Sequence, residues 1–150
     1  MKFTCFVEID LPIDEVIGLY DNVENLKEWQ DGFVSHEHLS GTPGESGAKS
    51  IFIYKAGRNV IELIETIKVK NLPQEFIGTY EATSMVNTMS NRFTALGENR
   101  SRYDAEIEYT RFNGFLPKMM ALLMPGVFKK QTQKWLNQFK VFAEKEKNHQ

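Results

Sequence analysis

The chain begins with an alternation of apolar and polar positions that then gives way to a helical period. Over residues 3–10 the odd-numbered positions are apolar, with Phe6 as the one apolar residue on the other side, which predicts a half-buried strand. Pro12 follows, at a position where a missing N–H costs a helix nothing, and apolar residues then recur at helical spacing up to Tyr20. A second short helix is expected to end near Trp29.

Between residues 33 and 112 the helical period disappears, and short apolar runs are separated by turns rich in glycine. The strands expected from this pattern cover residues 33–40, 49–55, 59–69, 76–83, 87–96 and 102–112. With the first strand they make a seven-stranded antiparallel sheet, because such short connections join neighbouring antiparallel strands. A final hairpin that closes on Gly97 and Ser101 would place Phe93 beside Ala105.

After Asn113 and Gly114 a helical stretch begins, and it is broken once at Pro125-Gly126. Beyond the break, one face of the predicted helix carries a stripe of mostly apolar side chains: Phe128, Gln131, Trp135, Phe139 and Phe142. This pattern predicts an amphipathic helix of about 20 residues, roughly 30 Å long, which would run across most of a sheet. Residues 144–150 are expected to form a polar, frayed tail.

Composition and charge narrow the possible functions. The length of 150 residues, with 41% apolar and 25% charged residues, fits one globular domain spanning residues 1–150. A net charge of −2 argues against a nucleic-acid partner. The most apolar window, residues 115–128, is too short for a transmembrane segment. A single cysteine, Cys5, and an N-terminus unlike a signal peptide lead us to expect a cytoplasmic protein.

The order of these segments resembles the START-like, or SRPBCC, superfamily, which includes lipid-transfer START domains, birch-pollen-allergen-like proteins and polyketide aromatase/cyclases. The markers of the resemblance span nearly the whole chain: Asp10-Leu11-Pro12 with Val16, Trp29, Gly41, Gly44, Gly47, Pro73, Gly97 and the C-terminal amphipathic helix. The resemblance implies an α+β helix-grip fold, in which a seven-stranded antiparallel sheet curves around a long C-terminal helix and two short helices follow the first strand. It also implies a cavity between helix and sheet, but no fixed catalytic motif.

A cavity of this kind is expected to bind or transport a small hydrophobic or aromatic molecule, such as a lipid or a polyketide, without a cofactor. The polar residues expected to face it are Tyr54, Glu65, Tyr80, Asn91, Tyr103 and Tyr109. The residues expected to form its walls are Phe93, Ile107, Met120, Leu123, Val127, Gln131 and Trp135. The alternative for each tyrosine is a place in the core with its hydroxyl at the edge. The oligomeric state is left open.

Glu65 is the main candidate for acid–base chemistry, with a tyrosine as the alternative. Alternation over residues 61–67 puts Glu65 on the more apolar face of its strand. If that face is turned inward, burial would raise the pKa of Glu65, and the protein could be an enzyme of the cyclase or dehydratase type. A slip or bulge near Glu65 would instead leave it at the solvent edge.

Three other features have alternative interpretations. His36 and His38 share a strand face, but a third and fourth metal ligand are missing, with His149 far away in the tail, so no metal site is expected. The Met-rich segment over residues 115–124 could be a lip over the cavity, part of the core, or a protein-binding or membrane-binding interface. The lysines that follow are either the solvated back of the last helix or a weak site for anionic lipid.

Overall fold

The computed structural model describes residues 1–147, and its helices and strands follow the expected order. The strands are β1 (Lys2–Ile9), β2 (Phe33–Ser40), β3 (Lys49–Ala56), β4 (Asn59–Asn71), β5 (Glu75–Glu81), β6 (Met85–Gly97) and β7 (Arg100–Phe112). The helices are α1 (Ile13–Tyr20), a 3₁₀ turn η1 (Val23–Asn25), α2 (Leu26–Trp29), α3 (Phe115–Leu123) and α4 (Gly126–Lys147). The seven strands and the two short helices after the first strand are therefore confirmed.

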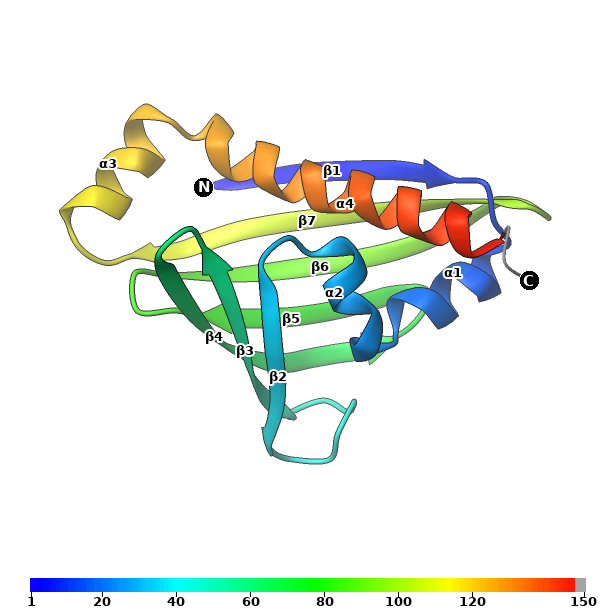
Figure 1. Cartoon of the computed structure of the whole chain (residues 1–150), viewed down its shortest axis with the longest axis horizontal. Coiled ribbons are helices and arrows are strands. Elements are labelled where there is room, and N and C mark those ends of the chain that lie inside the picture. The colour runs from blue at the N-terminus through cyan, green and yellow to red at the C-terminus, as the bar shows by residue number, and fades with distance from the viewer. Residues whose placement is uncertain (148–150) are drawn as a thin grey trace.

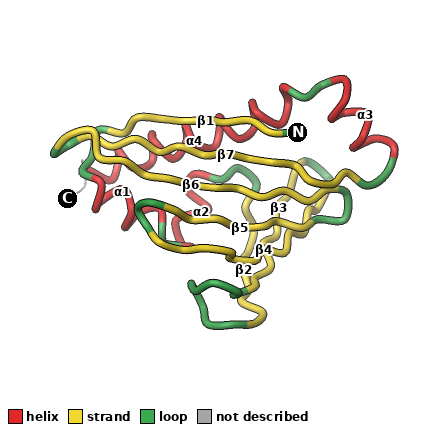
Figure 2. Tube along the Cα trace, turned by 180° about the vertical axis from the view of Figure 1, so that it is seen from behind, coloured by secondary structure: helices red, strands yellow, loops and turns green. Residues whose placement is uncertain are grey.

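All seven strands form one antiparallel sheet in the order β1-β7-β6-β5-β4-β3-β2. Strands β2 and β3 run steeply across the direction of β6 and β7, so the sheet is strongly curved (Figure 1). Helices α1, α2 and α4 all lie on its concave side, which we call the inner face (Figures 1 and 2). None of the described helices has the length and apolarity that a bilayer-spanning segment requires.

The core fills the part of the inner face that α1 and α4 cover. Phe139 of α4 is fully buried, and its ring packs edge-on against Trp29 with centroids 5.1 Å apart. Tyr20, at the end of α1, lies in the middle of the same cluster, 4.8 Å from the ring of Phe93 and 5.4 Å from that of Tyr103. Aromatic contacts of this kind add to the free energy gained by burial.

The register of the last hairpin differs from the predicted one by two residues. Phe93 pairs with Tyr103 rather than with Ala105. The cause is a tighter turn, because Gly97 pairs with Arg100 and the strand bulges between Ala95 and Gly97. A shift of two residues leaves every side chain on the same face of the sheet, so the predicted division into inner and outer residues still holds.

The break in the C-terminal helix is confirmed, because α3 ends at Leu123 and α4 begins at Gly126. The predicted buried stripe is partly wrong, since Gln131 is exposed and Leu136 is buried in its place. Leu136, Phe139 and Ala143 recur at helical spacing, and this alternative stripe was available in the sequence.

The tail prediction is wrong for residues 144–147, which continue α4. Glu144 accepts hydrogen bonds from the backbone N–H of Asp10 (2.9 Å) and from Nζ of Lys140 (2.7 Å). These bonds tie the last turns of the helix to the end of β1 and outweigh the partial burial of the carboxylate, so the pKa of Glu144 falls below its ordinary value. Residues 148–150, which include His149, lie outside the described part.

Candidate functional site

Glu65 and Tyr80 form a hydrogen-bonded pair on the inner face of the sheet. Cross-strand pairing places Glu65 of β4 opposite Ser50 of β3 on one side and opposite Tyr80 of β5 on the other. The hydroxyl of Tyr80 donates a hydrogen bond of 2.9 Å to Oε2 of Glu65. Strand β4 does bulge, but between Ile67 and Val69, so Glu65 keeps its inward direction and does not reach the solvent edge.

Burial raises the pKa of Glu65 above its ordinary value of 4.5, because removal from water penalises the charged carboxylate. The hydroxyl of Tyr80 and the positive charge of Lys70 oppose this rise, but they are the smaller effects. Lys70 is itself engaged in an ion pair with Asp21, at 2.9 Å. Glu65 therefore holds a proton at a higher pH than a solvated glutamate, and shifted pKa values of this kind are common among groups that exchange protons with a ligand.

Replacing Glu65 with glutamine is expected to flatten the dependence of stability on pH above the ordinary pKa of 4.5. The folded protein binds this proton more tightly than the unfolded chain, so the free energy of unfolding falls as pH rises from 4.5 through the raised pKa. Glutamine is always neutral and avoids that fall. Thermal unfolding followed by circular dichroism should show E65Q more stable than the wild type above this window and similar below it. Parallel pH profiles would contradict the assignment.

Gly78 fixes the position of the Tyr80 ring. A Cβ atom at Gly78 would lie 2.9 Å from the Tyr80 hydroxyl oxygen and 3.1 Å from two of its ring carbons. The ring of Tyr80 thus lies directly over the backbone of Gly78, in space that any other residue would take up. This close approach holds the hydroxyl beside Glu65.

Tyr54 and Trp135 lie beside this pair and join the sheet to the long helix. Their rings stack with centroids 5.5 Å apart, and the hydroxyl of Tyr54 donates a 2.6 Å hydrogen bond to Oε1 of Gln30. The negative charge of Glu65 and, above all, burial raise the pKa of Tyr54. Nε1 of Trp135 is buried and finds no hydrogen-bond partner among residues 1–147. The site therefore contains one unused buried donor.

A second polar group, around Tyr103, is closed inside the core. The hydroxyl of Tyr103 donates a 2.6 Å hydrogen bond to Oδ1 of Asn91, and Nδ2 of Asn91 donates one of 3.2 Å to the carbonyl of Phe76. Tyr20 is hydrogen-bonded to Tyr103 as well. Asn91, Tyr103 and their neighbours Phe93 and Ile107 are buried in the core. Hydrogen bonds to other protein groups already satisfy the polar side-chain atoms of Asn91 and Tyr103.

Solvent reaches the inner face at the other end of the sheet. Five inward side chains of β4, β5 and β6 are only half-buried: Leu63, Glu65, Tyr80, Asn87 and Met89. We call these five residues the open inner face. Tyr109, at its border, is also half-buried and packs on Phe128 with ring centroids 5.0 Å apart. The predicted site residues thus divide into a closed group in the core and an accessible group around Glu65.

Four predicted wall residues do not lie against this face. Met120, Leu123, Val127 and Gln131 are all exposed. Helix α3 leaves the end of β7 through Gly114, whose φ of 89° suits glycine, and projects beyond the sheet (Figure 1). None of its side chains, all within the described part of the chain, is buried, so the core alternative for the Met-rich segment is wrong. A lip and an interface remain.

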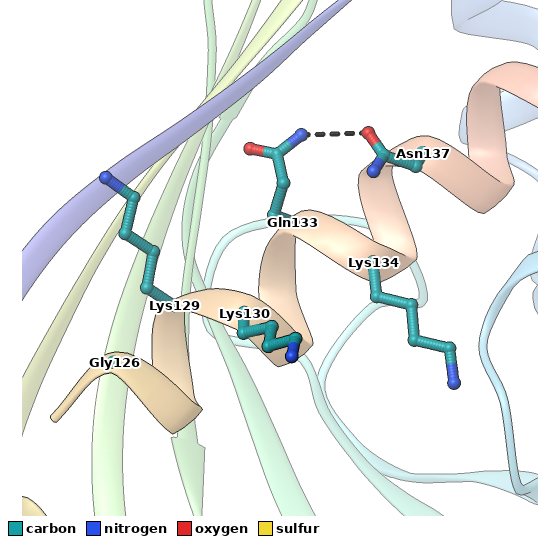
Figure 3. A pocket seen from close by; sticks show the side chains of 6 residues that line it. All are labelled: Gly126, Lys129, Lys130, Gln133, Lys134 and Asn137. Atoms are coloured by element: carbon teal, nitrogen blue, oxygen red, sulfur yellow. Dashed lines mark hydrogen bonds between the residues drawn. The ribbon is translucent and has the colours of Figure 1, made fainter. Parts of the chain in front are cut away.

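Two hollows lie on the outer side of α4, away from the open inner face. The first, of about 490 Å³, is lined by Gly126, Lys129, Lys130, Gln133, Lys134 and Asn137 (Figure 3). The second, of about 340 Å³, is lined by Glu28, Lys134, Asn137, Gln138, Val141, Phe142 and Lys145. Both open widely to solvent, and neither contains a residue expected to bind the ligand. The basic lining of the first was not expected from the sequence as a separate site.

The remaining candidate residues are two histidines, His36 and His38, and the single cysteine, Cys5. His36 packs its ring on Phe52, and burial lowers its pKa, while Nε2 of His38 lies 2.8 Å from the carbonyl of Gly41. Within residues 1–147 no three His, Cys, Asp or Glu side chains gather in a group that would hold a metal ion. Cys5 is buried and its pKa is raised by burial, so its thiol is unreactive.

No family model and no curated protein matches the sequence. Solved structures do share the architecture. An aromatase/cyclase from Streptomyces sp. R1128 matches with a TM-score of 0.80 and 13% identity over 96% of this chain and 93% of its own. A START superfamily protein from Mycobacterium smegmatis (TM-score 0.75, 10% identity, coverage 96% and 97%) and Ara h 8.0201 (0.74, 12%, 95% and 97%) are also similar. The protein has the START-like helix-grip fold expected from the sequence.

Proposed function

We propose that the protein binds a small, largely apolar molecule on the open inner face, with a polar group of that molecule at the Glu65–Tyr80 pair. The observation that carries this proposal is an inward carboxyl group, hydrogen-bonded at 2.9 Å, on an inner face that the helices leave half-exposed. Partial burial of a carboxyl group costs free energy unless hydrogen bonds compensate for the lost water, and a polar group of a ligand would supply such a bond beside the one from Tyr80. The similarity in fold to an aromatase/cyclase supports the same proposal.

The hydrogen-bonding groups around the open inner face suggest what the molecule carries. Glu65 and the Tyr80 hydroxyl can each accept a hydrogen bond, and the buried N–H of Trp135 has a free donor. Leu63 and Met89 supply apolar contact, and methionine adapts to varied shapes. A hydroxylated aromatic or polyketide-like molecule, with both a hydroxyl and a carbonyl, fits this set better than a bare hydrocarbon chain.

Native mass spectrometry of the purified protein tests the proposal. The protein is expected to carry a co-purified small molecule, or to retain an added polycyclic phenol in preference to a saturated fatty acid. The same phenol should raise the temperature of unfolding, since a ligand that binds the folded state alone stabilises it. A protein that retains neither probe and shows no thermal shift would contradict the proposal.

A second function, catalysis of a cyclisation or dehydration, is favoured by the raised pKa of Glu65 and its contact with Tyr80. A carboxyl group near a bound carbonyl could transfer the proton that such a reaction needs. The two functions are separated by E65Q: a carrier would still bind the phenol without converting it, whereas an enzyme would lose turnover of a bound polyketide substrate while keeping its affinity.

A further inference from the structure

Charge is distributed unevenly along the chain. Twenty of the 150 residues are acidic and the net charge is −2, yet residues 111–143 contain no aspartate or glutamate. The same segment contains six basic residues: Arg111, Lys118, Lys129, Lys130, Lys134 and Lys140. It comprises the end of β7, α3 and most of α4. A mildly acidic protein thus presents one strongly basic region, which would attract an anionic partner.

The same region exposes its largest apolar side chains. Phe115 is 77% exposed, Leu122 79% and Leu123 68%, and Leu116 and Met124 are exposed as well. We call these five residues the α3 patch. Four of them lie on α3 and Met124 directly follows it; this helix projects beyond the sheet, and the rest of the described chain leaves the five side chains exposed (Figure 1). A contiguous apolar surface of this kind on a folded protein marks an interaction site.

Lysines adjoin the α3 patch where α4 begins. Lys129 and Lys130 line the 490 Å³ hollow on the outer side of α4, together with Lys134 (Figure 3). Lys134 is paired with Asp31 at 2.7 Å, but within residues 1–147 no ion pair joins Lys118, Lys129 or Lys130 to a carboxylate. Lysine can extend its charge several ångströms from the backbone while its stem stays on apolar surface.

We propose that the α3 patch inserts into the interface of an anionic membrane, while Lys118, Lys129 and Lys130 contact lipid phosphates. At 100° per residue, Phe115, Leu116, Leu122 and Leu123 fall within about 120° of one another around α3, so they form one broad apolar face. A helix with such a face can lie in the plane of a membrane interface with its apolar side chains in the lipid. The lysines that adjoin it favour an anionic lipid surface over an uncharged groove on a protein partner. Nine residues are too few to cross a bilayer, so α3 lies in its surface layer.

Sedimentation with lipid vesicles tests the proposal without any ligand, so its failure is distinguishable from failure of the proposed function. The protein is expected to sediment with vesicles of phosphatidylcholine and phosphatidylserine, to bind pure phosphatidylcholine far more weakly, and to be released by salt. The double variants L122E/L123E and K129E/K130E should each lower the partition coefficient by about tenfold or more. All four side chains are exposed, so folding should be retained, as thermal unfolding will verify.

Two control variants introduce comparable charge changes elsewhere on the surface. V141E places a charge on the exposed far half of α4, and K55E/K68E reverses two exposed lysines on β3 and β4; both should bind as the wild type does. Equal binding to the two lipid mixtures, or equal loss in the controls, would overturn the proposal. A third result would also overturn it: a wild-type protein that is a dimer in light scattering and does not bind vesicles, together with an L122E/L123E variant that is a monomer. The α3 patch would then be a protein interface.

Discussion

Replacing Phe139 with alanine is expected to lower the free energy of unfolding by about 3–5 kcal/mol. Phe139 is 0% exposed and contacts the rings of Tyr20, Trp29 and Tyr103, so its removal leaves a cavity where α4, α1 and the sheet meet. The tyrosine hydroxyls of this cluster are tied by hydrogen bonds and cannot collapse into the space. Urea denaturation measures the change.

A substitution on the other side of α4 provides the control. V141A removes an apolar side chain that is 66% exposed, and it should change the free energy of unfolding by less than about 0.5 kcal/mol. If F139A also cost less than about 1 kcal/mol, the aromatic cluster would not be the centre of the core and the packing of α4 on the sheet would be wrong.

Replacing Asn87 with tryptophan is expected to abolish binding on the open inner face. Asn87 is half-buried and pairs with Tyr80 on one side and with Tyr109 on the other, so an indole there would occupy the space in front of the Glu65–Tyr80 pair. The dissociation constant of a polycyclic phenol should rise by at least about a hundredfold, equivalent to about 2.7 kcal/mol. Fluorescence titration or calorimetry measures this change.

The neighbouring residue supplies a matched variant. T88W introduces the same side chain one position along β6, where it points to the outer face. It should leave the affinity for the phenol unchanged. Equal loss in T88W would mean that tryptophan disturbs the strand itself, and full affinity in N87W would place the ligand elsewhere.

The elements of the fold were predictable because each has a short-range cause. Alternation predicted the strands, and Pro12 and Pro125-Gly126 predicted where helices begin and break. The register of the last hairpin was not predictable, because it depends on a bulge beside Gly97 that the alternation of apolar and polar residues does not reveal. Alternation left two directions open for Glu65, inward or at the solvent edge after a slip or bulge, and the cross-strand pairing with Tyr80 gives the inward one.

The candidate site was harder to predict, because it depends on how far the helices cover the sheet. Tyr80 and Tyr103 each lie between two polar residues in the sequence, yet Tyr80 belongs to the open inner face and Tyr103 is enclosed in the core with Asn91. Long-range packing of α1 brings Tyr20 to Tyr103 and closes that end. Likewise, no periodic pattern in the sequence predicts that α3 projects away from the sheet. Its direction depends on the backbone angle at Gly114, and α3 buries none of its side chains.

A methyl NMR titration tests the central claim, that the open inner face holds a ligand, most directly. Protein labelled at its leucine, valine and methionine methyl groups would be titrated with a polycyclic phenol. Saturable shifts are expected at Leu63 and Met89, both on the open inner face, and none at Val141 on the exposed side of α4. Shifts confined to Val141 and the α3 leucines, with Leu63 and Met89 unchanged at saturation, would contradict it.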